Sequence, residues 1–376
     1  MNCVNLDRKD DIEIKVFTSL AKHRLLENEY TPGQRLNALL AEKELDRIPF
    51  QLFGYSSKLI NRTLYDFFFD PIVRFKTTCA QIIRWGAVEL QNVTRINSYQ
   101  VGEALGAKLK YGEDAAPSTA DYVLKNENDS AKLSVPDLSA YLVKDIWSIK
   151  NIINRFDDMI GPPTTFLYPP FSWVATYLLN VNQLLINLYD NPSFVHELCE
   201  FATELEIMVS NRLTEEADCA FFMPDGFCEL LSPDQYQEFA IPYMAKLINA
   251  NKNSLFYITV PKPDYRLVTD LYQAVRNHKK LICMGSSINP ANPLQNINDL
   301  HQFCTILNTL KRPFQIAINQ NVVKQASEQE IETHIKEMID AARGSNFMIR
   351  TDVIDPETPP RKIDTLIGLV NRYGKV

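Results

Sequence analysis

The chain has 376 residues, of which 45% are hydrophobic and 23% are charged. This composition is typical of a globular protein with a large core and excludes a low-complexity or fibrous chain. The formal net charge of −7 argues against a general nucleic-acid binder, because no Lys- or Arg-rich patch offsets it.

The cysteines and the first residues indicate a reducing compartment. The seven cysteines are odd in number and never form a C-x-x-C pair, so we expect no disulfide framework. The start, MNCVNLDRKDDIEIKVF, is charged and lacks the apolar region of a secretory signal. No apolar run approaches the roughly 18 residues of a membrane span. We therefore predict a cytoplasmic protein that does not contact a membrane.

The predicted elements alternate between short apolar runs and amphipathic helices. Residues 1–45 are expected to be helical, since TPGQRLNALLAEKEL begins with a Thr-Pro cap signal and carries a leucine stripe. Eight apolar runs follow, at residues 48–53, 93–101, 159–168, 219–223, 254–260, 280–285, 314–319 and 347–354. Helical patterns such as SEQEIETHIKEMIDAA separate them, which favours parallel β/α units. Eight is also the number of strands in a closed (β/α)8 barrel.

The segment 107–150 differs from its surroundings because it is polar and rich in turn-forming residues. We interpret it as a polar excursion over the barrel mouth and not as a separate domain. The predicted division is an N-terminal helical extension over residues 1–45 and a barrel over residues 46–376.

Polar residues at the predicted strand ends are the candidates for function, because barrel sites form where strands end and the following loops begin. About half of such residues are expected only to cap helices or to satisfy loop backbone. The candidates are Gln51, Tyr55, Asn97, Tyr168, Asp225, Tyr257, Thr259, Ser286, Asn319, Gln320 and Asp352. Aromatic residues are plentiful in the same loops, which suits a flat or aromatic ligand.

A family resemblance rests on four phrases. They are similar to the uroporphyrinogen decarboxylase superfamily, which also contains corrinoid-linked methyltransferases: RLNALLAEKELDRIPF (35–50), EALGAKLKYGEDAAPSTADYVLK (103–125), LSPDQYQEFAIPYMAKLI (231–248) and DPETPPRKIDTLIGLVNRYG (355–374). Their order and span cover nearly the whole chain. The resemblance implies a (β/α)8 TIM barrel with an N-terminal helical extension.

The decarboxylase branch of this superfamily carries arginines after the first strand, where they bind substrate carboxylates. This chain has Gly54 and Lys58 at those places. Asn97 stands where the decarboxylases have an Asp, and Asp352 stands where they have a His; of the signature after the third strand, Tyr177 remains. These differences argue against decarboxylation of a tetrapyrrole.

For the thiol-methylating branch, the resemblance implies a zinc site whose ligands are a His-x-Cys pair at the end of the fifth strand and a Cys at the end of the eighth. Those positions here hold Tyr257, Thr259 and Asp352. Hydroxyl groups are too basic as anions to replace imidazole and thiolate, so we predict no zinc. The histidines do not supply a site either, because all of them fall in helical or helix-loop stretches away from the predicted strand ends and are predicted on the surface: His23, His196, His278, His301 and His334.

The leading hypothesis is a corrinoid-dependent methyltransferase that takes methyl from a small donor, such as an aromatic O-methyl or N-methyl compound, without zinc. The sequence has no D-x-H-x-x-G cobalamin motif, so the corrinoid is expected on a partner protein. Tyr257 and Asp352 are the predicted catalytic residues, because each is able to donate a proton or hydrogen bond to the leaving heteroatom. The predicted substrate-binding residues are Gln51, Tyr55, Asn97, Tyr168, Asp225, Thr259, Ser286 and Asn319.

Two alternatives stay open. In the first, the chain is a decarboxylase-like lyase in which Asp352 acts as acid or base and Lys58 holds a carboxylate. In the second, the barrel has lost catalysis and only binds a ligand. The resemblance also allows a homodimer, which no interface pattern in the sequence decides.

Overall fold

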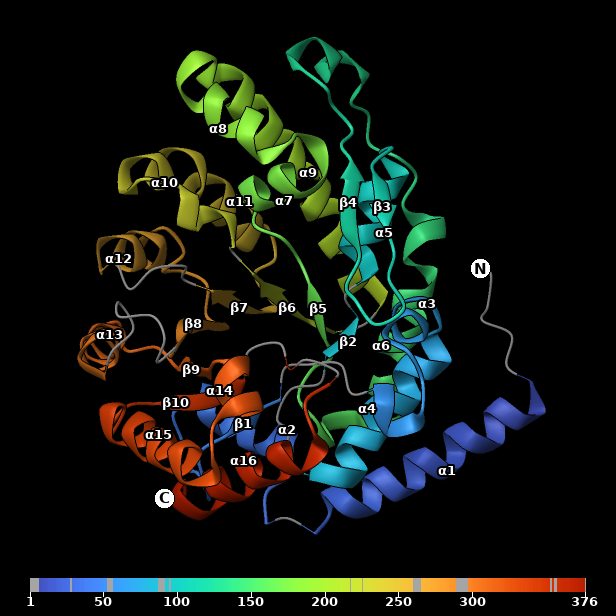
Figure 1. The fold of residues 1–376 in the computed structure, drawn as a ribbon, viewed down its shortest axis with the longest axis vertical. Helices are drawn as coiled ribbons and strands as arrows, with labels where there is room; N and C mark the ends of the chain where they lie inside the picture. Colours follow the sequence, from blue (N-terminus) through green and yellow to red (C-terminus); the bar gives the residue numbers. More distant parts are fainter. Residues whose placement is uncertain are drawn as a thin grey trace.

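The computed structural model describes residues 7–27, 29–52, 57–86, 92–94, 96–216, 218–224, 226–259, 265–288, 297–351, 354 and 357–375. Eight parallel strands form one sheet in the order β1-β10-β9-β8-β7-β6-β5-β2. They are β1 (Phe50–Gln51), β2 (Asn92–Thr94), β5 (Thr164–Phe166), β6 (Ala220–Met223), β7 (Leu255–Thr259), β8 (Leu281–Ile288), β9 (Phe314–Ile318) and β10 (Phe347–Thr351). This order is that of a (β/α)8 barrel, and each predicted apolar run overlaps one of the strands (Figure 1). The predicted fold class is confirmed.

Helices surround the strands and cover the outside of the barrel (Figure 1). They are α1 (Arg8–Leu25), α2 (Pro32–Leu40), α3 (Leu64–Phe69), α4 (Pro71–Trp85), α5 (Ile96–Ala104), α6 (Ser139–Phe156), α7 (Pro170–Trp173), α8 (Val181–Asp190), α9 (Pro192–Glu216), α10 (Pro233–Phe239), α11 (Ile241–Ala250), α12 (Tyr265–Ala274), α13 (Ile297–Thr309), α14 (Gln320–Gln325), α15 (Glu328–Ala341) and α16 (Pro360–Tyr373). In the described part of the chain, no helix has the length and apolar character that crossing a bilayer requires.

Each strand serves two cores, because successive side chains point to opposite faces. The outward residues of β9, Phe314, Ile316 and Ile318, belong to the large core between the strands and the helices. The inward residues form a smaller cluster inside the barrel together with two leucines of α2: Leu36, Leu39, Phe166, Ala220, Phe222, Leu255, Tyr257, Ile282 and Met348. The helix α2 therefore closes the amino-terminal end of the barrel.

Local sequence explains how α2 reaches that position. Thr31 caps the helix, accepting from the backbone N of Gln34, and the Gln34 side chain accepts from the backbone N of Thr31 in return. At Gly33, a Cβ would lie 1.9 Å from the carbonyl oxygen of Asp158, so only glycine allows this close approach. The apolar stripe predicted from the sequence then faces the barrel interior.

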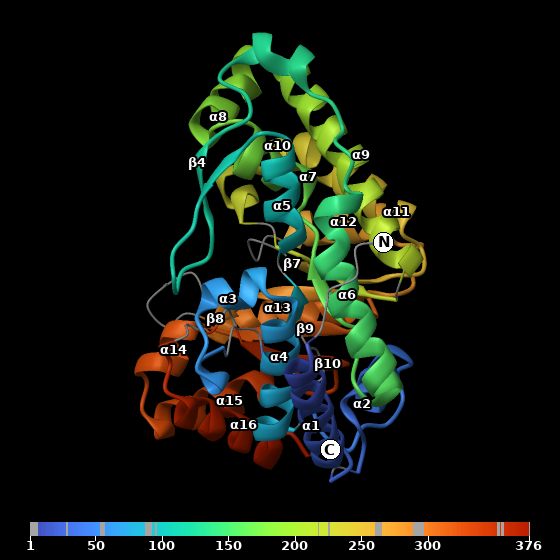
Figure 2. The same ribbon diagram turned by 90° about the vertical axis from the view of Figure 1, so that its right-hand side faces the viewer.

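The polar excursion begins as a two-stranded hairpin of β3 (Lys108–Lys110) and β4 (Ser118–Asp121). After β4, the backbone N of Leu124 donates to the carbonyl O of Leu178 at 2.8 Å, in the segment that follows β5. At the hairpin tip, Asp114 pairs with Lys58, in the segment that follows β1, at 2.6 Å. The excursion thus lies at the carboxyl ends of the strands, as predicted. Figure 2 shows β4 and α2 on opposite sides of the barrel.

Two sequence predictions about element boundaries were wrong. Residues from Ser139 onward, predicted as part of the excursion, form the long helix α6, whose Leu142 and Ile149 are buried in the large core. The predicted run 93–101 is a strand only as far as Thr94, and its remainder belongs to the helix α5. A short apolar run does not distinguish a strand from a buried helix, which explains the second error.

Candidate functional site

The predicted site residues differ in how far the structure describes them. Tyr55, Asp225 and Asp352 lie outside the described residues, so their predicted roles stay predictions. The backbone alone is described for three more: Asn97 in the first turn of α5, Thr259 at the end of β7 and Ser286 within β8. Ser286 was expected just after its strand, but β8 continues to Ile288 through a register shift. The described side chains are those of Gln51, Tyr168, Tyr257, Gln320 and Asn319.

Tyr257 is the predicted catalytic residue whose side chain the structure describes. It lies in the middle of β7, is fully buried and points into the barrel, where Phe222 and Ile282 are its register neighbours on the adjacent strands. Its hydroxyl has no hydrogen-bond partner among the residues that the structure describes. Burial raises the pKa of this phenol well above its ordinary value. Tyr257 is therefore a neutral O–H group, able to donate a hydrogen bond.

Gln51 belongs to an amide pair that the sequence analysis did not anticipate. Gln315 on β9 is fully buried, and its Nε2 donates to Oε1 of Gln51 at 2.9 Å. The same Nε2 lies 3.0 Å from Sδ of Met348, which belongs to the inner cluster with Tyr257. The amide pair therefore lies inside the barrel and joins β1 to β9 across β10.

Arg350 is a second inward residue that the sequence analysis missed. It lies on β10 in register with Gln51, is only 4% exposed, and its Nη1 donates to the carbonyl O of Thr351 at 3.1 Å. The barrel interior therefore holds a guanidinium group near its mouth. A signal for both missed residues was available. Every second residue of a strand points to the same face, so the residues two and four positions before a predicted site residue share its side of the strand. Gln315 lies four positions before Asn319, and Arg350 lies two positions before Asp352.

The remaining described candidates have structural contacts. Asn319 follows β9 and caps α14, its Oδ1 accepting from the backbone N of Asn321 at 2.8 Å. Gln320, the next residue, begins α14 and is partly exposed. Tyr168 follows β5, is partly exposed and meets the ring of Tyr177 edge-on at 6.2 Å between centroids. Tyr168 therefore contributes an aromatic wall, and the carbonyl oxygen of Asn319 is engaged by its own helix.

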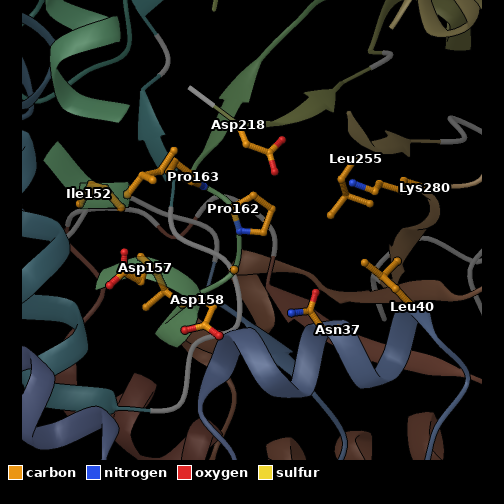
Figure 3. Close-up of a pocket in the computed structure, with 13 residues that line it drawn as sticks. Asn37, Leu40, Ile152, Asp157, Asp158, Pro162, Pro163, Asp218, Leu255 and Lys280 are labelled. Carbon is orange, nitrogen blue, oxygen red and sulfur yellow. The ribbon is translucent and has the colours of Figure 1, made fainter. Parts of the chain in front are cut away.

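A pocket of about 300 Å³ lies at the opposite end of the barrel. Figure 3 shows Asn37 and Leu40 of α2 on one side of it, with Leu255 and Lys280 from the amino-terminal ends of β7 and β8 on the other. The exposed Asp157, Asp158 and Asp218 complete its polar rim. This position, at the strand beginnings, is far along the barrel from the predicted site residues.

The histidines and acids of the described ranges form no group of three or more His, Cys, Asp or Glu side chains that would hold a metal ion. The zinc prediction concerns Thr259 and Asp352, whose side chains are not described, and it stays a prediction. The surface prediction was wrong for His278, which is 3% exposed. Its Nε2 lies 3.1 Å from the carbonyl O of Asn251 and burial lowers its pKa. His278 is a core residue beside Phe256.

A parallel (β/α)8 barrel with polar side chains in its interior is the architecture of barrel enzymes. The particular family follows from comparison with known sequences. The family model of uroporphyrinogen decarboxylase (URO-D) matches residues 31–373, and the chain belongs to this family. The helix α1 precedes the matched range.

The relatives are enzymes of two kinds, at low identity. A uroporphyrinogen decarboxylase of Hydrogenovibrio crunogenus is 25% identical over 158 residues, which cover 40% of this chain and 44% of that protein. The methylcobamide:CoM methyltransferase MtbA of Methanosarcina acetivorans is 24% identical over 230 residues, 60% of this chain and 67% of MtbA. The match to the decarboxylase thus spans less than half of that relative.

Among solved structures, a methyltransferase from Methanosarcina mazei superimposes with a TM-score of 0.76 at 17% sequence identity. The superposition covers 92% of this chain and 99% of that protein. This likeness establishes a shared fold.

Proposed function

We propose that this chain is a methyltransferase that moves a methyl group from a small methylated donor to a corrinoid carried by a separate protein, without zinc. The observation that supports this most is the Tyr257 hydroxyl, which is fully buried inside the barrel and has no partner in the described ranges. An unpaired buried hydroxyl costs about 1–3 kcal/mol of folding free energy, so its presence is best explained by a ligand that accepts its hydrogen bond.

The corrinoid is a second substrate in this proposal, and its reduced cobalt supplies the electron pair that takes up the methyl group. The donor's bond from methyl carbon to oxygen or nitrogen breaks, and its electron pair stays on the heteroatom. Tyr257 stabilises that developing charge by donating its O–H, because burial keeps the phenol protonated. Asp352 is proposed as the acid that protonates the leaving group.

The orienting roles are proposed for the remaining candidates at the strand ends. The hydrogen bond from Gln315 holds the side chain of Gln51 in one position, which suits a residue that orients a ligand. Tyr168 supplies an aromatic face beside the mouth. The residues Tyr55, Asn97, Asp225, Thr259, Ser286 and Asn319 complete the proposed substrate-binding set.

The name of MtbA places it in the thiol-methylating branch, where the resemblance implies a zinc site at the positions of Tyr257, Thr259 and Asp352. A phenol whose pKa is raised by burial does not ionise near neutral pH, so it does not provide the anionic ligand that zinc prefers. This chemistry favours a reaction that activates a leaving group over one that activates an incoming thiol.

The lyase alternative required Lys58 to hold a substrate carboxylate. Lys58 already pairs with Asp114 at 2.6 Å, and both side chains are about half exposed. An exposed lysine that is engaged by the excursion is a poor anchor for a buried carboxylate. This contact makes the methyltransferase the better-supported proposal.

The proposal is tested by incubating the protein with cob(I)alamin and a panel of O-methyl and N-methyl compounds while the cobalt absorbance is followed. We expect methyl transfer from at least one donor. We also expect Tyr257→Phe to slow it about 100-fold, because general acid catalysis contributes roughly 10²–10⁴-fold. Tyr236→Phe is the control, since Tyr236 is also fully buried but lies on α10, outside the barrel. No transfer from any donor, or an unchanged rate in Tyr257→Phe, would contradict the proposal.

A further inference from the structure

Gln315 combines deep burial with an unused acceptor. Its Nε2 is engaged by Gln51 and Met348, whereas its Oε1 is buried and has no hydrogen-bond partner in the part of the chain that the structure describes. From this we infer that Gln315 is a specificity-determining residue: its Oε1 accepts a hydrogen bond from an O–H or N–H group of the methyl donor. The identity of the ligand as a methyl donor rests on the proposed function; the acceptor itself does not.

The orientation of the Gln315 amide follows from Met348. The Sδ atom of Met348 only accepts and lies 3.0 Å from Nε2, whereas the Gln51 amide presents an acceptor or a donor depending on its own rotation. Rotating the amide by half a turn would place its oxygen against the sulfur, bringing two acceptors together. The oxygen therefore points away from Met348, and the group that completes it must be a donor.

The inward column of β9 carries only a small residue between Gln315 and the mouth. Inward positions on β9 are Gln315 and then Ala317, because Phe314, Ile316 and Ile318 belong to the outer core. Ala317 contributes only a methyl group between Gln315 and the carboxyl end of the strand. The inferred route for a narrow polar group of the ligand is along β9, past this methyl group, to Oε1.

Tyr257 and Gln315 offer a donor and an acceptor of hydrogen bonds within the same interior. Tyr257 supplies the O–H and Gln315 supplies the amide oxygen, and Met348 belongs to the inner cluster with Tyr257 while it contacts Gln315. A ligand that satisfies both must carry an accepting atom and a donating group. A methyl ether next to a hydroxyl group, or a secondary N-methylamine, has both features. Burying a charged group costs more free energy than one hydrogen bond to a neutral amide contributes, so the donating group of the ligand is expected to be neutral.

The experiment measures binding of matched pairs of probes that differ only in the donating hydrogen. The pairs are 2-methoxyphenol against 1,2-dimethoxybenzene, and N-methylaniline against N,N-dimethylaniline, with binding measured by calorimetry in the absence of corrinoid. In at least one pair, the wild-type protein should bind the O–H or N–H member about tenfold or more tightly, the range of one buried hydrogen bond. No such preference in either pair, including no binding at all, overturns the inference.

Variants then assign the preference to one residue. Gln315→Met keeps the volume and should abolish the preference, whereas Gln81→Met should keep it, since Gln81 is a buried glutamine on α4 outside the barrel. Gln51→Met, which removes one partner of the Gln315 amide, should weaken the preference and serves if Gln315→Met does not fold. A preference that persists in Gln315→Met, or in Gln51→Met where that variant serves, overturns the inference. A preference without any methyl transfer to cob(I)alamin would leave the acceptor standing and refute the proposed function.

Discussion

The amino-terminal end of the barrel and the barrel interior treat buried polar groups in opposite ways. At the amino-terminal end, Arg35 of α2 is 1% exposed and binds Asp46 through two hydrogen bonds of 2.7 and 2.6 Å. Along the interior, Tyr257 and Gln315 each keep a buried polar atom that meets no partner within the described ranges. The amino-terminal end is built for stability, whereas the interior keeps polar groups that are unpaired among the described residues and cost stability, as expected when a fold supports a site.

The sharpest way to break the amino-terminal end is to push α2 away from the barrel. Gly33→Ala would place a Cβ at 1.9 Å from the carbonyl O of Asp158 and 2.8 Å from that of Ile160, and neither backbone atom can move cheaply. We expect a loss of about 3 kcal/mol or more in the free energy of unfolding, measured by chemical denaturation. Gly368→Ala is the matched control, because it lies in α16 with nothing within 4 Å of the added Cβ. That control should be stabilised by up to about 1 kcal/mol. Equal effects of the two substitutions would contradict the assigned role of α2.

The next largest effect concerns the ion pair between the buried Arg35 and the partly exposed Asp46. Burial raises the pKa of the Asp46 carboxyl, but the hydrogen bond and charge of Arg35 outweigh it, and the pKa lies below its ordinary value. Asp46→Asn would leave the Arg35 charge buried without its partner, so we expect a loss of about 2 kcal/mol at neutral pH.

The pH dependence of that loss has a defined sign. A carboxylate with a lowered pKa stabilises the folded state above its unfolded pKa of about 3.9, and this stabilisation disappears as the pH falls through the folded pKa. The difference between wild type and Asp46→Asn should therefore be full at pH 7 and shrink below about pH 4. Asp340→Asn, which breaks an exposed pair with Arg343, should change stability by less than about 0.5 kcal/mol at any pH. A difference that stays constant down to pH 2 would contradict the pairing.

The sequence predicted the barrel because its strands are marked by apolar runs and its helices by caps and stripes. All eight strands overlap a predicted run, since burial on both faces makes barrel strands continuously apolar. The site was less accessible to the same reasoning. Gln315 and Arg350 lie inside apolar runs, so the sequence pattern marks them only as strand residues. They lie next to Gln51 because the first strand, β1, pairs with the last strand, β10. Asn319 was chosen because it is a polar residue that follows a strand, and in the structure its side chain also caps a helix.

The smallest effect tests the interior from the side of stability. Because the Tyr257 hydroxyl meets no partner in the described structure, Tyr257→Phe removes a desolvated polar group and keeps the ring in the inner cluster. We expect the free energy of unfolding to stay equal or to rise by up to about 1 kcal/mol, although the same variant is proposed to lose methyl transfer. Tyr236→Phe should instead lose a few tenths of a kcal/mol, since its hydroxyl contacts Sδ of Met244 at 3.7 Å. A loss above about 1 kcal/mol in Tyr257→Phe would mean that the hydroxyl is satisfied inside the folded protein. The Tyr257 hydroxyl would then be paired inside the protein, as Arg35 and Asp46 are at the amino-terminal end, and it would no longer indicate a bound ligand.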